Sequence, residues 1–192
     1  MLNDRSTPLS LLATRRSGKP RDLIAPGPDA AHMAQILEIA ARTPDHGKLA
    51  PWRFVIVPDE RRGALASVIT DAYRAERPQA GRQEIESLEQ FATQAPALVV
   101  VLASPKIESH IPLWEQELSV GAACMNLLHA ANALGFAGGW LTGWAAFSDA
   151  VRDAFGAAPE RIAGFIFLGT AAKQLEERPR PDLSKIVSSW GG

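Results

Sequence analysis

Four short apolar runs along the chain predict the strands of a buried sheet. Trp52–Val57 is β-branched and aromatic between two prolines, and Ala97–Ala103 is continuously apolar, as expected of an interior strand. Residues 161–169 form another apolar run, and residues 138–142 predict a shorter strand. The sequence therefore predicts a sheet whose strands lie inside the protein.

Helical periodicity fills the segments between these runs. Thr7 and the proline after it are an N-terminal signal for a short helix that reaches Arg16, and Asp29 can cap a second helix that reaches Ala41. Pro44 disfavours helix at the residue before it, so a loop is expected at residues 44–51. Further helices are expected at residues 59–76, around residues 85–91, at residues 112–134 and at residues 148–155.

The longest helical pattern, residues 112–134, has almost no polar face. Beyond Leu118 its strongly polar residues are Asn126, His129 and Asn132. A helix that is apolar on every side is expected to be buried nearly all round.

The alternation of helix and strand could indicate a doubly wound parallel sheet. The turns that follow the strands at residues 52–57 and 97–103 lack the glycine fingerprint of a pyrophosphate site, which argues against that architecture. A chain of 192 residues is expected to form a single domain and can bury enough core without a metal or disulfide. Beyond Ala171, two prolines predict an extended C-terminal arm.

Composition narrows the range of partners. Lys and Arg number 20 against 21 Asp and Glu, a net charge of −1, so no overall positive field would draw the chain to nucleic acid. No apolar stretch approaches the roughly 20 residues of a membrane helix, and the N-terminus lacks the apolar segment of a secretory signal. We therefore expect a cytoplasmic protein that binds neither nucleic acid nor membrane.

Arg15, Arg16 and Ser17 form the first candidate binding group, at the end of the first predicted helix. Two guanidinium groups and a hydroxyl could hold a phosphate while one arginine reaches a carbonyl or ring nitrogen. A simpler interpretation is that the cations complement the helix C-terminus, worth about 0.3–1 kcal/mol. From these residues alone the simpler interpretation is preferred.

Arg42 and His46 flank a loop that Pro44 forces out of helix, and they form the second candidate group. The loop would present His46 as a donor or acceptor whose charge responds to its surroundings near neutral pH. The Pro-Asp pair in this loop is also ordinary turn chemistry, which favours a turn when the segment is taken alone.

Trp140, Leu141 and Thr142 lie in a glycine-rich segment, residues 138–143, and form the third candidate group. Glycine lets a flat ligand or a neighbouring backbone come close. A bulged strand beneath a core tryptophan is the alternative.

Several familiar chemistries are missing from the sequence. Cys124 is the single cysteine, and its apolar neighbours indicate a buried, inert thiol. No Cys and His cluster has zinc spacing, and no G-x-S-x-G elbow occurs. Glu115 and Glu117 lie on different helical faces, which disfavours an acid–base pair. An enzyme built on this chain would need a cofactor.

The order and separation of these groups resemble the FMN-dependent nitroreductase family, especially its compact bacterial branch. The resemblance covers nearly the whole chain. It is carried by Arg-Arg-Ser at residues 15–17, Ala-Arg-Thr-Pro-Asp-His at 41–46 leading into Pro-Trp-Arg-Phe at 51–54, Trp-Glu-Gln-Glu at 114–117, Gly-Trp-Leu-Thr-Gly at 139–143, and Gly-Phe-Ile-Phe-Leu-Gly-Thr at 164–170.

This resemblance implies an α+β, three-layer fold in which helices flank a mixed central sheet. It also implies a homodimer, with the long helix at the interface and the C-terminal arm exchanged between subunits. FMN lies at that interface in the family, and the loop at residues 41–46 comes from the partner chain. By position the flavin contacts would be Arg15, Arg16, Ser17, Arg42, His46, Trp140, Leu141 and Thr142.

The family's chemistry is ping-pong: NADH or NADPH reduces the flavin and leaves, and a nitroaromatic, quinone or other small electron-poor acceptor takes its place. No side chain need act as a nucleophile or obligatory acid, so no catalytic residue is expected. Three alternatives remain: a flavin carrier or sensor without turnover, an enzyme of this fold with different chemistry, and a flavin-free interaction domain.

The sequence departs from the family pattern at two positions. Leu141 stands where related sequences carry an arginine, and Ala50 stands where a glutamine is common. Each change removes a polar group near the expected site. We expect binding to survive and substrate preference to shift.

Overall fold

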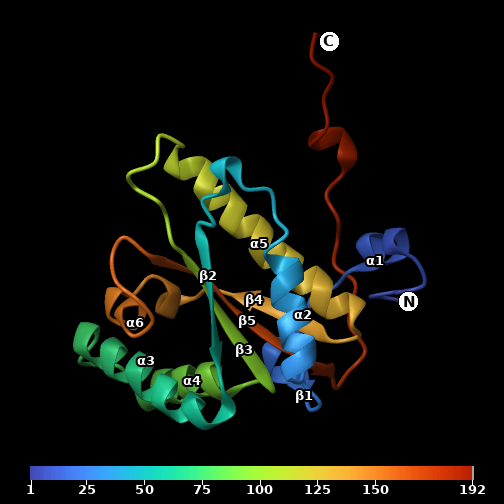
Figure 1. The fold of residues 1–192 in the computed structure, drawn as a ribbon. Helices are drawn as coiled ribbons and strands as arrows, with labels where there is room; N and C mark the ends of the chain where they lie inside the picture. Colours follow the sequence, from blue (N-terminus) through green and yellow to red (C-terminus); the bar gives the residue numbers. More distant parts are fainter. Residues whose placement is uncertain (192) are drawn as a thin grey trace.

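A five-stranded sheet forms the middle layer of the protein in the computed structural model, which describes residues 1–191 (Figure 1). Its central strand pairs with three others, and all four pairings are antiparallel. The strands are β1 (Leu23–Ile24), β2 (Trp52–Val57), β3 (Ala97–Ala103), β4 (Ala137–Leu141) and β5 (Arg161–Ala171), with β5 at the centre.

The α+β class is confirmed, but the sheet is antiparallel among the described residues, not mixed as expected. A strand buried on both faces is apolar whichever way its neighbours run, so the sequence pattern carries no information about strand direction. Direction is set by the connections. Two helices lead from β2 back to β3 as an antiparallel neighbour, and this order also excludes the doubly wound alternative.

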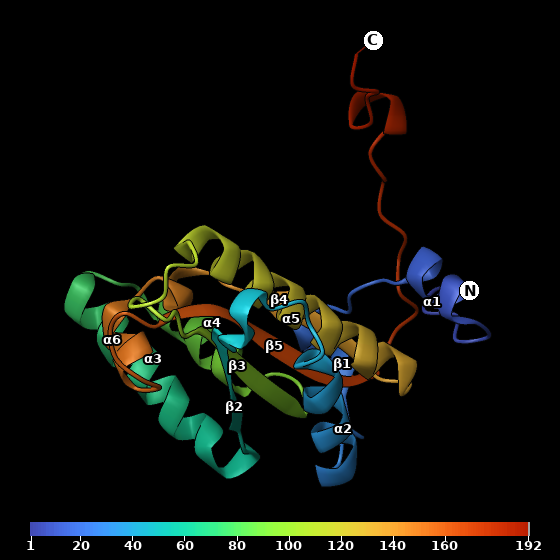
Figure 2. The ribbon, with the colours of Figure 1, turned by 45° about the horizontal axis from the view of Figure 1, so that its top comes forward.

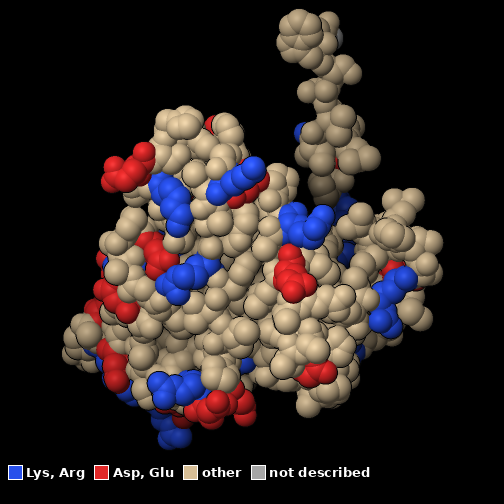
Figure 3. Space-filling view, viewed as in Figure 1, with Lys and Arg blue, Asp and Glu red and all other residues tan. Residues whose placement is uncertain are grey.

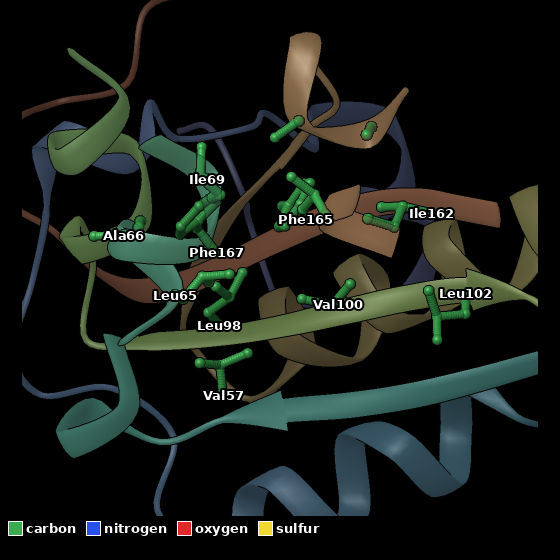
Figure 4. Packing of buried hydrophobic residues seen from close by; sticks show 14 of the residues in the cluster. Val57, Leu65, Ala66, Ile69, Leu98, Val100, Leu102, Ile162, Phe165 and Phe167 are labelled. Carbon is green, nitrogen blue, oxygen red and sulfur yellow. The ribbon is translucent and has the colours of Figure 1, made fainter. Parts of the chain in front are cut away.

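Both faces of the sheet are covered, which explains the continuous apolar runs. In β3, Leu98, Val100 and Leu102 point into one core, and Val99 and Val101 point into the other. Figure 4 shows the first of these cores, where side chains of β2, β3 and β5 meet those of a helix. All five of these β3 side chains are fully buried.

Five of the six α-helices in the described chain form the two outer layers, and α1 lies beside α5. One layer holds α3, α4 and α6, which pack together, and the other holds α2 and α5 (Figures 1 and 2). Their bounds are α1 (Pro8–Thr14), α2 (Ala30–Ala40), α3 (Arg62–Glu76), α4 (Arg82–Thr93), α5 (Leu113–Ala133) and α6 (Asp149–Asp153). No helix in the described chain is both long and apolar enough to cross a membrane.

The helix starts follow the sequence signals. The side chains of Thr7, Asp29 and Ser148 each accept a backbone N–H three residues on, as expected of N-caps. At its other end α1 stops at Thr14, before the expected Arg16. The Asn3 side chain accepts the Arg16 N–H at 2.6 Å and donates to the Arg16 carbonyl at 3.2 Å, which removes these backbone groups from the helix.

Helix α5 is buried on one side only, in contrast to the expected all-round burial. Trp114 and Leu118 are 68% and 55% exposed, and Gly121, Ala122 and Met125 continue the same apolar stripe toward the C-terminus. An exposed apolar stripe of this length is typical of a protein–protein interface.

The C-terminal arm is extended, as predicted, and leaves the rest of the chain beside α1 (Figures 1 and 2). Its outer part is mainly tan in Figure 3, because few of its side chains are charged. Leu183, Ile186, Val187 and Trp190 are all more than half exposed. These residues have no apolar surface to cover within the described chain.

Candidate functional site

The first and third candidate groups lie side by side at the edge of β4. The Gly18 N–H donates to the Gly138 carbonyl at 2.9 Å, which ties the segment after α1 to this strand. A Cβ on Gly139 would lie 2.6 Å from the Gly18 carbonyl oxygen and 3.1 Å from Pro20. Glycine is therefore required here for a close backbone approach, as the sequence suggested, although the backbone that approaches belongs to the same chain.

Gly139→Ala should destabilise the protein by about 1–3 kcal/mol, the usual cost of overpacking. The added methyl group meets a backbone oxygen, which can move only if the segment that carries Ser17 moves with it. Urea denaturation at fixed protein concentration measures the change. Gly63→Ala is the matched control, since nothing lies within 4 Å of that Cβ position. Equal stability of the two variants would contradict the proposed clash.

A cationic cavity lies between this segment and the start of the arm. It has a volume of about 260 Å³, and four cationic side chains line it against two carboxylates. The cationic residues are Arg16, Lys19, Arg21 and Lys173, and the acidic residues are Asp22 and Glu176. The Lys173 ammonium pairs with Asp22 at 2.8 Å, and Ser17 also lines the cavity. The excess of positive charge suits an anionic ligand.

The two adjacent arginines have different surroundings. The Arg16 Nε donates to the Glu176 carbonyl at 2.8 Å, and Glu177 lies 3.9 Å away, so the arm holds this guanidinium. The Arg15 Nη1 donates to the Ser17 hydroxyl at 3.2 Å and forms no ion pair within residues 1–191. Burial, then the charges of Arg180 and Arg16, lowers the pKa of Arg15. A bound anion would relieve that repulsion.

The cationic residues that line this cavity form a cationic cluster together with Arg15, which contacts Ser17, and Arg180, which contacts Arg15. The sequence analysis missed two members of this cluster, Lys173 and Arg180. The Arg180 guanidinium donates to the Arg15 carbonyl at 3.3 Å, 165 residues away along the chain. The only sequence signal was the concentration of arginines in the arm, at Arg178 and Arg180. Such a signal does not say where the arm returns to the body.

In the third candidate group, the side chains of Trp140 and Leu141 pack against the sheet, and Thr142 borders two cavities. The Trp140 indole N–H donates to the Ala163 carbonyl at 3.0 Å, so the ring lies over β5. The alternative of a bulged strand beneath a core tryptophan is wrong, because Trp140 is 38% exposed and β4 pairs with β5 in an unbroken register. Leu141 packs against the core on the α3 face of the sheet. Thr142 lines a cavity of about 430 Å³ beside Trp140 and a second one of about 260 Å³ beside Arg21.

The second group lies elsewhere on the chain, against the beginning of α5. The His46 Nδ1 is 2.7 Å from the Glu115 Oε2, and the Asp45 carboxylate accepts the Ala50 N–H at 2.7 Å. Gly47, Lys48 and Ala50 all have positive φ angles, so the turn is tight and specific. Arg42 is exposed at the end of α2.

Within one chain, the first candidate group (residues 15–17) and the second (Arg42 and His46) lie far apart. Burial, then the charge of Arg15, lowers the pKa of His129, which places Arg15 near the end of α5, whereas His46 contacts its first turn. Glu115 and His129 are separated by about 21 Å at a rise of 1.5 Å per residue. Figure 1 shows the same separation, with α1 and the loop after α2 near opposite ends of α5.

The cysteine and the two glutamates considered in the sequence analysis do not form a reactive group in this chain. Cys124 is fully buried, and burial raises the pKa of its thiol to about 12, so it is inert at neutral pH as predicted. Glu115 and Glu117 contact different partners, His46 and Arg161. No cluster of three metal-ligating side chains occurs in the described part of the chain.

The fold and the cationic cavity define a three-layer α+β protein that can hold a small anionic ligand at the edge of its sheet. Comparison with known proteins makes this more specific. The sequence profile of the Nitroreductase family matches residues 12–170. A Haemophilus influenzae protein named as a candidate NAD(P)H nitroreductase is 35% identical over 175 residues, which cover 90% of this chain and 92% of that protein.

Solved structures agree on the fold. A nitroreductase-like family protein from Bacillus cereus superposes with a TM-score of 0.81 at 20% identity, over 97% of each chain. A nitroreductase with bound FMN from Bacteroides fragilis gives a TM-score of 0.70 at 22% identity, over 94% of this chain and 97% of that one. The chain belongs to the nitroreductase family, as its motifs predicted, and is therefore an oxidoreductase of nitroreductase type.

Proposed function

We propose that this protein binds FMN and transfers electrons from NADH or NADPH to a small electron-poor acceptor such as a nitroaromatic or a quinone. The single observation that carries the proposal is the cluster of cationic side chains beside β4, in which Arg15 forms no ion pair within the described chain. The name of the Haemophilus relative supports the electron donor, and the FMN-bound Bacteroides structure supports the cofactor.

The residues present fit a flavin phosphate. A phosphate carries up to two negative charges and three strong acceptors, and Arg15 and Ser17 supply donors at a half-buried position. The exposed Arg180, which also pairs with Glu177 at 2.9 Å, adds further donors beside them. The excess of cations over carboxylates in the adjoining cavity would stabilise that charge. Leu141, which packs into the core, can contribute only its backbone, so the missing arginine at this position costs the site a side-chain donor.

We further propose a homodimer whose two sites each use both chains. If a second copy packs its α5 antiparallel on the exposed stripe of the first, the start of one helix lies beside the end of the other. That arrangement would bring Arg42 and His46 of one copy within reach of Arg15 of the other, although in one chain the positions on α5 near these groups lie about 21 Å apart along the helix. Its support is the exposed apolar stripe and the extended arm, both of which need a partner surface.

When bound, FMN would supply the ring that accepts and then releases a hydride. Arg15, Ser17 and Arg180 would hold its phosphate, while the backbone of residues 140–142 and the side chain of Thr142 would border the ring. The apolar side chains of both copies would exclude water from it. Donor and acceptor would occupy the same position in turn, which is a ping-pong sequence.

The test is an anaerobic absorption spectrum of the purified holoprotein before and after NADH or NADPH. We expect a yellow dimer whose flavin absorbance bleaches with at least one nicotinamide and returns on addition of 1,4-benzoquinone. Protein that is colourless and gains no thermal stability from added FMN would contradict the proposal. Bound flavin that neither nicotinamide bleaches would favour the carrier, and a stable monomer by light scattering would remove Arg42 and His46 from the site.

A further inference from the structure

Helix α5 holds the loop at residues 43–46 with three polar side chains from a single face. Asn126 donates to the Thr43 hydroxyl at 2.8 Å, Ser119 donates to the Pro44 carbonyl at 2.6 Å, and Glu115 contacts His46. At 3.6 residues per turn, positions 115, 119 and 126 lie within about 40° of each other around the helix. The loop therefore runs along α5, fixed at successive residues.

The contact with His46 differs from the other two because it involves the ring of a candidate site residue. The His46 Nδ1 lies 2.7 Å from Glu115 Oε2. An ionised carboxylate has no proton to donate, so Nδ1 carries the hydrogen, and Nε2 is the one ring nitrogen left to meet a ligand. The His46 and Glu115 side chains are 66% and 37% exposed in the single chain, so this contact is not needed to fill a core.

We propose that Glu115 is a positioning residue, which fixes the tautomer and direction of His46 so that Nε2 faces the flavin site of the second copy. This inference rests on the proposed function and adds a residue to it. The charged side chain of Asp45 is already engaged with the Ala50 N–H, and Lys48 makes no ion pair in the described structure. Glu115 is thus the carboxylate that orients the ring.

A double-mutant cycle on the dimeric holoprotein tests the coupling. Partners that orient metal-ligating histidines typically contribute 10–100-fold, and at the low end of that range the same orienting role at His46 would make Glu115→Ala lower kcat/KM for 1,4-benzoquinone by about tenfold. In a His46→Phe background the same change should have an effect below about twofold, because the ring it orients is gone. Glu115→Gln, which keeps an acceptor oxygen, should restore part of the loss. Independent, additive effects of Glu115 and His46 would overturn the proposal.

Nitrogen-15 NMR of the His46 ring measures which ring nitrogen carries the proton. This tautomer would not change on loss of Glu115 if that residue only stabilised the fold. We expect the neutral ring to be protonated at Nδ1 in the parent protein and to become a mixture of tautomers in Glu115→Ala. Asn126→Ala, which loosens the same loop at Thr43, should lower thermal stability and leave the tautomer unchanged. Glu108→Gln, an exposed carboxylate with no ion pair in residues 1–191, controls for lost charge.

The two proposals fail in different ways. A parent protein that binds no FMN, or whose flavin no nicotinamide bleaches, contradicts the proposed function. A ring spectrum that is the same with and without Glu115, in a protein that binds and reduces FMN normally, contradicts the positioning role alone.

Discussion

Replacing Arg15 with alanine should weaken FMN binding by about 1.5–3 kcal/mol, the usual contribution of a hydrogen bond to a charged group. This corresponds to a rise in Kd of about 10- to 150-fold. The reason is that Arg15 is half-buried among cations, donates only to Ser17, and forms no ion pair in the described chain. Fluorescence titration of the apoprotein with FMN measures the change.

Riboflavin distinguishes a phosphate contact from a ring contact. It lacks the phosphate, so its affinity should be nearly the same in the parent protein and in Arg15→Ala. Arg15→Lys should fall between them for FMN, because an ammonium keeps the charge and loses the forked donor geometry. Arg74→Ala, on the exposed face of α3, is the control for loss of one positive charge. An equal loss of FMN and riboflavin affinity would assign Arg15 to the ring instead.

Arg62→Ala should lower the free energy of unfolding by about 3 kcal/mol or more, at roughly 1–3 kcal/mol for each buried acceptor left without a donor. The Arg62 side chain is 2% exposed and donates to the carbonyls of Val57 at 3.0 Å, Ala92 at 2.9 Å and Gln94 at 3.4 Å. It thus joins the end of β2, the start of α3 and the end of α4. Burial lowers its pKa to about 10, so it remains a cation at neutral pH.

Urea denaturation at one protein concentration measures this loss, since a dimer's stability depends on concentration. Arg61→Ala is the matched control, because the neighbouring side chain is exposed and surface changes usually stay within about 0.5 kcal/mol. Arg62→Lys should recover little stability, since one ammonium cannot reach carbonyls at both ends of the guanidinium. A loss in Arg62→Ala no larger than that in Arg61→Ala would show that the buried cation is dispensable.

The strands and helices were largely predictable because burial and capping leave local signals. The apolar runs at β2 and β3 coincide with the strands, and Thr7, Asp29 and Ser148 cap helices as their residue types favour. β1 was missed because its two residues are defined by pairing with Thr170 and Ala171, and no periodicity can appear over so short a segment.

The candidate site was predictable only in part. The motifs named Arg15, Ser17 and Thr142, which the chain does bring to one edge of β4. They did not reveal Lys173 or Arg180, because the arm reaches the cluster by long-range contacts that leave no pattern in neighbouring residues. Nor could they show that Trp140 is occupied with the Ala163 carbonyl or that Leu141 faces the core.

The sequence by itself determined the nitroreductase family, the α+β class and the positions of most elements, since these depend on side-chain polarity and on motif order along the chain. Only the tertiary structure decided the antiparallel sheet, the contacts of the arm with Arg15 and Arg16, and the contact of Glu115 with His46. The physical reason is that each of these features joins residues far apart in sequence, and their relative placement follows from packing of the whole chain.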